Sequence, residues 1–160
     1  MVMAVLAAVI HRQQTGEGQY IDLSMTDAVF SMHALSGAEW LSGGEEPEAE
    51  SGMLNGGTLY DYYETRDGRW ISVGSLEPVF LKRLCLEMDL QQFEGIPLDD
   101  VKSQKRLKSK LRKAFKTRGF QEWIEIFQKI DACVEPVLKP SEAASHPQLR
   151  EREMIGKVKN

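Results

Sequence analysis

The residue pair Glu77-Pro78 offers the most distinctive chemistry in this 160-residue sequence. It follows a strand-like run that reaches Gly74, and Pro78 suits the first position of a helix. A carboxylate held at the end of a strand by a rigid turn is well placed to orient a partner in a cleft. An acid that only favours the exposed N–H groups of a helix terminus would occupy the same position. The sequence leaves both interpretations of Glu77 open.

Two glycine-containing segments could approach a ligand closely. The backbone carbonyl and N–H groups of Asn55-Gly56-Gly57 could contact a ligand, although a hinge explains the same residues more simply. The pair Gly16-x-Gly18 follows a helix and precedes a predicted strand, which is the reverse of the order that cradles a pyrophosphate. We interpret that pair as a turn.

The histidines and cysteines have no metal-binding spacing. His11, His33 and His146 are far apart in the sequence, and Cys85 and Cys133 do not form a C-x-x-C pair. We therefore predict no metal site. Both cysteines fall in apolar patterns, so we expect buried thiols in a reducing compartment.

The charge distribution is bipolar. Residues 102–118 include nine basic and no acidic side chains, whereas the rest of the chain has 11 basic and 24 acidic ones. Such a segment could bind nucleic acid, an anionic membrane or a cofactor phosphate, but its one aromatic residue, Phe115, belongs to the apolar stripe of a helix. We predict a solvated helix face, with no nucleic-acid or membrane partner.

The first predicted helix has no start signal. Apolar residues repeat at helical spacing from Val2 to Ile10, and the helix is apolar all round, which is typical of burial in something larger than this chain supplies. A glycine turn leads to a predicted strand at 19–24, and Ser24 can cap a second helix that extends to Trp40. This order continues a wound α/β unit.

An acidic stretch rich in Gly, Glu, Ser and Pro, 42–57, predicts a mobile linker. The runs 59–65 and 69–75 flank Gly68 and predict an antiparallel hairpin. Further periodic patterns predict helices from Pro78, at 103–116 and from Thr117, a strand at 134–138 and a terminal helix at 141–153.

The composition, 42% hydrophobic and 28% charged, indicates one globular domain or a domain and a piece, and excludes disorder throughout. The longest apolar run, 1–10, is half of the roughly 20 residues that cross a bilayer, and no basic segment precedes it as in a secretory signal. We expect a cytoplasmic protein.

Several segments together carry a family resemblance: 4–8, 15–28, Tyr60 to Trp70, Val73 to Phe80, Asp131 to Val137, and Glu142, Ala143, His146, Pro147 and Arg152. As a set they resemble the family III CoA-transferases. The motif Gly74-x-x-Glu77-Pro78-x-Phe80 is more similar to the α-methylacyl-CoA racemase branch than to the formyl-CoA transferase branch, which has a glycine-rich loop.

The resemblance implies an internal fragment of a longer protein, with an α+β fold. A small domain with an antiparallel hairpin and several helices would follow a helix-strand-helix remnant of a Rossmann-like large domain. The implied parts are a large-domain remnant with its outgoing helix (1–41), the linker (42–57), the small domain (58–140) and a segment that returns toward the large domain (141–160). Family members form interlocked dimers, so a homodimer or higher self-association is expected.

The implied activity is exchange of the proton next to a CoA thioester. In the racemase branch a His and an Asp face opposite sides of the α-carbon, and neither has a counterpart in this chain. Glu77 matches a glutamate that orients the His. Met53, Asn55, Gly56 and Gly57 are the candidates for binding the acyl-CoA substrate. Methionine adapts to a moving acyl chain, so Met25, Met32 and Met53 could contribute, although core packing is the more common role of such residues. Coenzyme A is part of that substrate, and no tightly bound cofactor is implied.

Two other functions stay open. One is a CoA-transferase that acts through an aspartyl-CoA intermediate on an Asp missing from this chain. The other is a non-catalytic truncated domain that only folds or associates.

Overall fold

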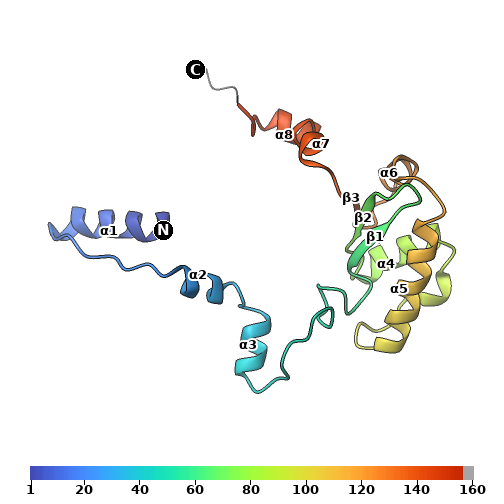
Figure 1. Cartoon of the computed structure of the whole chain (residues 1–160), viewed down its shortest axis with the longest axis horizontal. Helices are drawn as coiled ribbons and strands as arrows, with labels where there is room; N and C mark the ends of the chain where they lie inside the picture. Colours follow the sequence, from blue (N-terminus) through green and yellow to red (C-terminus); the bar gives the residue numbers. More distant parts are fainter. Residues whose placement is uncertain (157–160) are drawn as a thin grey trace. The chain divides into compact units, whose positions relative to one another are not determined.

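The computed structural model describes residues 1–156, and the chain divides into two units (Figure 1). The N-terminal unit is Met1–Pro47 and the C-terminal unit begins at Glu48. Within 1–156 no helix is long and apolar enough to cross a membrane. The limits 1–41, 42–57, 58–140 and 141–160 expected from the sequence stay predictions.

The N-terminal unit consists of three helices, α1 (Val2–Thr15), α2 (Met25–Ser31) and α3 (Ser36–Leu41). Gly16 ends α1 in the left-handed region, with φ 79°, as a helix-terminating glycine does. Ser24 caps α2 as predicted, because its side chain accepts a hydrogen bond from the Asp27 N–H. The helix expected to run on to Trp40 is interrupted between α2 and α3.

The strand predicted at 19–24 is wrong. These residues have no regular secondary structure, because a strand needs a neighbouring strand for its hydrogen bonds and the N-terminal unit has none. The Rossmann-like part of the expected fold therefore gains no support from this unit.

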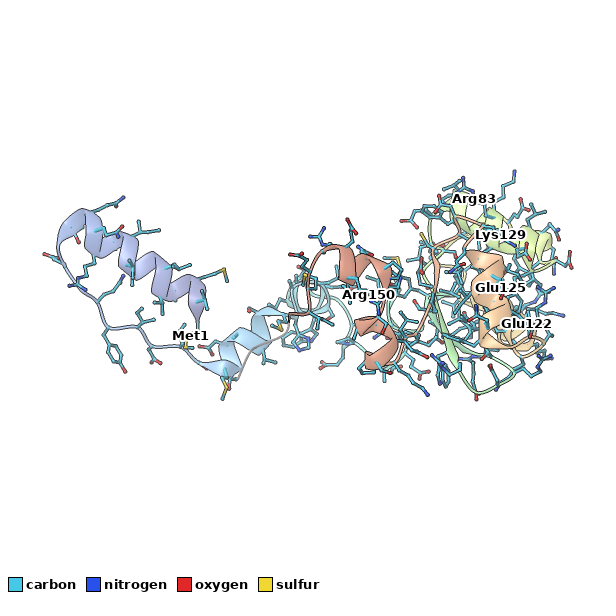
Figure 2. All side chains as sticks on the ribbon, turned by 90° about the horizontal axis from the view of Figure 1, so that it is seen from above. Met1, Arg83, Glu122, Glu125, Lys129 and Arg150 are labelled. Atoms are coloured by element: carbon cyan, nitrogen blue, oxygen red, sulfur yellow. The ribbon has the colours of Figure 1, made fainter. Side chains whose placement is uncertain are left out.

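No residue of the N-terminal unit is buried. The apolar side chains of α1 remain 45% exposed or more at Val5, Leu6, Val9 and Ile10. Figure 2 shows the side chains of this helix, which starts beside Met1, extending outward with no core around them. The unit contributes helices with apolar surfaces and no packed interior.

The C-terminal unit contains a three-stranded antiparallel sheet in the order β1-β2-β3. Its strands are β1 (Asp61–Glu64), β2 (Trp70–Val73) and β3 (Val134–Pro136). The predicted hairpin is confirmed, with Tyr63 opposite Ile71 and Gly68 in the turn at φ 76°. Val73 pairs with Val134 of β3, which is shorter than the predicted 134–138.

The three larger helices of this unit lie beside the sheet (Figure 1). The larger ones, α4 (Pro78–Glu87), α5 (Val101–Phe115) and α6 (Phe120–Phe127), confirm the three helices predicted from apolar spacing, and a short 3-10 turn, η1 (Gln91–Phe93), follows α4. The single helix expected at 141–153 is two, α7 (Pro140–Ala144) and α8 (Pro147–Glu151). Pro147 starts α8, because it lacks the N–H that a continuous helix would need there. Helices and an antiparallel sheet together confirm the α+β class.

Aromatic rings form the centre of the core. The Phe115 ring lies 5.2 Å from that of Tyr63, 5.1 Å from that of Trp123 and 6.2 Å from that of Phe127. Tyr63, Ile71 and Val73 supply the inner face of the sheet. The opposite, outer face carries Tyr62, Trp70 and Ser72, the first two of them exposed.

The two cysteines differ, contrary to the prediction that both are buried. Cys85 is fully buried in α4, and burial raises the pKa of its thiol to about 11. Cys133 is exposed and adopts a positive φ of 51°. Its neighbour Ala132 fills the apolar position instead, so the turn directs the Cys133 side chain outward.

Candidate functional site

Glu77 occupies the N-cap position of α4, and a short turn, Gly74 to Leu76, separates it from the end of β2. The residue is exposed, and its side chain accepts no hydrogen bond from the first turn of the helix. Its backbone carbonyl instead accepts from the N–H groups of Phe80 and Leu81, at 3.0 and 2.9 Å. The carboxylate is therefore not consumed in capping, although Pro78 fixes where it starts.

The turn from Gly74 to Glu77 is held by the loop 131–135. The Gly74 N–H donates to the Cys133 carbonyl at 2.8 Å, and the fully buried Ser75 hydroxyl donates to the Ala132 carbonyl at 2.5 Å. Within the turn, the Leu76 N–H donates to the Gly74 carbonyl at 2.8 Å. These bonds give Glu77 a rigid base.

Negative charge gathers around Cys133. Burial raises the pKa of the Cys133 thiol, and the carboxylates of Glu77, Asp131 and Glu135 raise it further. A raised pKa disfavours the thiolate, which is the nucleophilic form of a cysteine. Glu77 belongs electrostatically to this acidic group.

Two adjoining hollows cross the outer face of the sheet. One, of about 400 Å³, is lined by Tyr60, Ser72, Gly74 and residues 130–135. The other, of about 340 Å³, is lined by Glu50, Leu54, Asn55, Gly56, Tyr60, Asp61, Tyr62 and Ser72. Because Tyr60 and Ser72 line both, the hollows form one surface, which we call the outer-face groove.

The structure brings some of the predicted site residues together. Asn55 and Gly56 line the outer-face groove, whereas Met53, Gly57 and Glu77 are not among its lining residues. Glu77 is joined to the groove through the turn that begins at the lining residue Gly74. The binding roles of these residues stay predictions.

The loop around Gly57 is closed on itself. The Gly57 N–H donates to the Gly52 carbonyl at 3.0 Å, and the Thr58 hydroxyl donates to the Met53 carbonyl at 2.7 Å. A Cβ at position 57 would lie 2.1 Å from the carbonyl oxygen of Ser51, so only glycine fits there. This loop presents Asn55 and Gly56 as a fixed edge of the groove.

Lys108 anchors that edge to α5, although it was not among the residues predicted for the site. This buried ammonium donates to the Gly56 carbonyl and lies 2.9 Å from an Asp61 carboxylate oxygen, with Arg112 at 3.3 Å from the same oxygen. Burial alone would raise the Asp61 pKa, but the Lys108 hydrogen bond, the Tyr62 N–H and both positive charges outweigh it and hold the pKa below its usual value.

A signal for Lys108 existed in the sequence. Gln104 and Lys108 stand four residues apart within the apolar stripe of α5, where only polar groups with partners are tolerated. Gln104 is also buried, and its side-chain carbonyl accepts from the Leu59 N–H at 3.1 Å. Tyr60 and Ser72 offered no comparable signal, because their surroundings come from distant segments.

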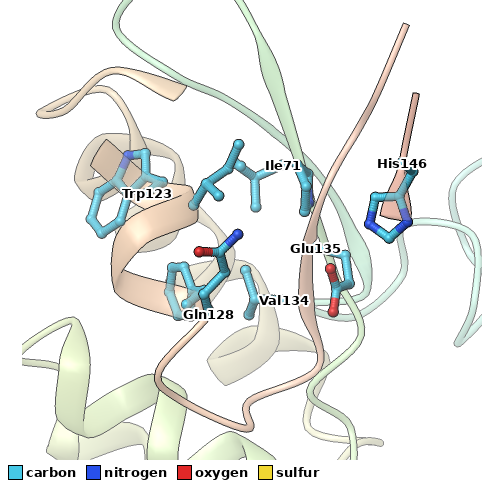
Figure 3. Close-up of a pocket in the computed structure, with 9 residues that line it drawn as sticks. Ile71, Trp123, Gln128, Val134, Glu135 and His146 are labelled. Atoms are coloured by element: carbon cyan, nitrogen blue, oxygen red, sulfur yellow. The ribbon is translucent and has the colours of Figure 1, made fainter. Parts of the chain in front are cut away.

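A third hollow, of about 170 Å³, lies beside β3 (Figure 3). The close-up shows Trp123 and Gln128 on one side of this strand and His146 on the other. His146 begins α8, where its Nδ1 accepts from the Gln148 N–H at 3.3 Å. Within 1–156 no three His, Cys, Asp or Glu side chains are grouped as a metal site would require.

Comparison with known proteins identifies the family. The model described as CoA-transferase family III matches residues 1–160. Human alpha-methylacyl-CoA racemase is 30% identical over 151 residues, covering 94% of this chain and 40% of the relative. The acetyl-CoA:oxalate CoA-transferase of Acetobacter aceti is 27% identical over 162 residues, covering 97% of this chain and 41% of the relative.

The fold agrees with this match. A CAIB/BAIF family protein from Brucella suis superimposes with a TM-score of 0.74 at 19% identity, over 96% of this chain and 42% of that structure. The chain thus spans about two fifths of the length of these relatives. It belongs to CoA-transferase family III, as the segments around Tyr60, Glu77 and Cys133 indicated.

Proposed function

We propose that this chain is part of an acyl-CoA enzyme that acts on 2-methylacyl-CoA thioesters. The enzyme would invert the configuration of the α-carbon by removal and return of the α-proton. The observation that supports the proposal is the Glu77 carboxylate, which is exposed, makes no capping bond and stands on a turn held by three hydrogen bonds. Coenzyme A would enter as part of the substrate.

In this proposal Glu77 is a positioning residue. Inversion needs one base on each face of an enolate-like intermediate, so a single carboxylate cannot perform it. The family resemblance assigns those bases to a His and an Asp that have no counterpart in this chain. The Glu77 carboxylate would accept a hydrogen bond from the imidazole N–H, fix its tautomer and stabilise its protonated form.

A CoA-transferase is the second candidate, supported by the match to the acetyl-CoA:oxalate enzyme. Such an enzyme would form an aspartyl-CoA thioester on an Asp outside this chain and would pass CoA to an acceptor acid. A non-catalytic truncated domain is the third candidate function.

We also propose a homodimer and a cytoplasmic location for the full-length protein.

Hydrogen exchange separates these functions. The full-length protein would be incubated with a 2-methylacyl-CoA in deuterated water without an acceptor acid. A racemase incorporates deuterium at the α-carbon under these conditions, and we expect that result. CoA transfer that appears only when an acceptor acid is added, with no exchange, would overturn the proposal in favour of the transferase. The 160-residue chain alone should catalyse neither reaction, and turnover by it would refute the assignment of the bases to other segments.

A further inference from the structure

Tyr60 stands at the junction of the outer-face groove. Its side chain is 38% exposed and lines both hollows. Its Cε2 atom lies 3.3 Å from the point that a Cβ of residue 74 would occupy. The glycine at position 74 thus lets the ring rest directly on the turn that carries Glu77.

The same residue is tied to the loop on the opposite side of the groove. The Tyr60 N–H donates to the Thr58 hydroxyl at 3.1 Å, and that hydroxyl donates to the Met53 carbonyl at 2.7 Å. One continuous set of contacts therefore runs from the Met53 loop through Tyr60 to the Glu77 turn. The backbone of Tyr60 is held at the loop end, and its ring lies beside Gly74 at the other.

The charges along the groove exclude one class of ligand. Asp131 and Glu135 line the first hollow and Glu50 lines the second, whereas neither hollow has a Lys or Arg among its described lining residues. Two of the groove's acids are paired, Asp131 with Arg83 at 2.7 Å and Asp61 with Lys108 at 2.9 Å, so Glu135 and Glu50 supply its remaining negative charge. An acyl chain that ends in a carboxylate would meet negative charge along the groove. A neutral chain would meet the rings of Tyr60 and Tyr62 and the side chain of Leu54.

We infer that the outer-face groove binds an uncharged alkyl chain, the acyl part of the thioester, and that the Tyr60 ring is the specificity-determining contact between its two hollows. This inference rests on the proposed function for the identity of the ligand. A chain whose reacting end lies near the Glu77 turn fills the hollow beside Gly74 first. A longer chain crosses the Tyr60 ring and reaches Asn55 and Gly56 in the second.

The test uses the isotopically labelled 160-residue chain and N-acetylcysteamine thioesters as probes, followed by NMR. The 2-methyldecanoyl probe should shift the amide signals of Ser72, Gly74, Asn55 and Gly56, and a 2-methylbutanoyl probe only the first two. A succinyl probe, which carries a carboxylate, should bind at least tenfold more weakly than the 2-methylbutanoyl probe of similar length.

Variants assign the contact to the ring. Tyr60→Ala should lower the affinity for the 2-methyldecanoyl probe by about tenfold, because one buried aromatic contact is lost. Tyr60→Phe keeps the ring and should keep that affinity. Tyr20→Ala, at a tyrosine of the N-terminal unit that is 93% exposed, is the control and should change nothing. Long-probe binding that shifts none of the four amides, equal binding of the succinyl probe, or an unaffected Tyr60→Ala variant would overturn the inference.

The outcome is separable from that of the exchange experiment. Deuterium exchange by the full-length protein without these amide shifts would leave the reaction standing and remove the groove as its acyl site. Shifts without exchange would keep the groove as a thioester site and remove the racemase assignment.

Discussion

Helices α1 and α5 show how differently the two units of this chain use apolar residues. In α5 these residues form one stripe that ends in the fully buried Phe115, with basic residues on the rest of the helix surface. In α1 they occur all round, and every one is partly or fully exposed. A helix with one apolar stripe buries it against neighbours on one side, whereas a helix that is apolar all round needs partners on several sides. The C-terminal unit supplies its own partners, and the N-terminal unit does not.

The largest expected effect lies at the aromatic centre of the C-terminal unit. Phe115→Ala should lower the free energy of unfolding by about 3–5 kcal/mol, because it removes a buried ring and leaves a cavity among three other rings. Leu6→Ala in α1 is the comparison and should change it by less than about 0.5 kcal/mol. Denaturant unfolding followed by tryptophan fluorescence measures both. Equal losses would show that α1 is buried as well as α5.

The buried ammonium of Lys108 should have the next effect. Lys108→Met removes the partner of Asp61 and of the Gly56 carbonyl, and we expect a loss of about 1–3 kcal/mol, less than for a fully buried pair because Arg112 remains near Asp61. Lys113→Met, at an exposed lysine of the same helix, is the control.

The pH dependence sharpens this test. The folded Asp61 pKa lies below its unfolded value, so its contribution is present above the unfolded pKa, about 3.9, and is lost as the pH falls through the folded pKa. Between pH 5 and pH 2 the Lys108→Met variant should therefore lose stability less steeply than the wild type. A parallel pH dependence of the two would contradict the assignment of this pair.

Disruption of the closed loop at Gly57 should give a loss of comparable size. An added methyl group at Gly57 meets the Ser51 carbonyl, so Gly57→Ala should cost about 1–3 kcal/mol or displace the loop. Gly18→Ala, with nothing within 4 Å of the added group, should cost almost nothing. Thermal unfolding and the amide signals of Asn55 and Gly56 report the two effects. A Gly57→Ala variant with normal stability and unchanged signals would refute the closed loop.

The smallest effect on folding, and a clear one on association, is expected in the N-terminal unit. Burial of its apolar surface between chains stabilises contacts by about 25 cal/mol per Å², so the chain should self-associate as its concentration rises. Leu6→Glu combined with Val9→Glu should shift sedimentation toward the monomer, and Gln13→Glu, which adds a charge to the same helix, should not. A wild-type chain that stays monomeric at high concentration would contradict this prediction.

The elements predicted correctly are those whose signals are local. The hairpin around Gly68 and the helix from Pro78 follow from turn chemistry and apolar spacing within a few residues. The strand at 19–24 and the burial of Cys133 were wrong because each depends on neighbours that lie elsewhere in the chain or are absent from the unit.

The same distinction between local and distant signals applies to the residues of the candidate site. The place of Glu77 at a helix start was predictable from the proline that follows it. Tyr60 was not, because its surroundings are assembled by the fold from the Met53 loop, Gly74 and the loop 131–135.

The most direct test of the central claim is the Glu77→Gln exchange rate in the full-length protein. Glutamine keeps the size of the side chain but removes the charge that stabilises a protonated imidazole, so α-proton exchange should fall by roughly 10- to 100-fold. The stability of the 160-residue chain should change by less than about 1 kcal/mol, because only an exposed charge at a helix end is lost. Glu125→Gln, at an exposed position of α6, is the matched control and should leave both quantities unchanged. Normal exchange in the Glu77→Gln enzyme, with or without a loss of stability, would contradict the account and reduce Glu77 to an acid that only favours the start of α4.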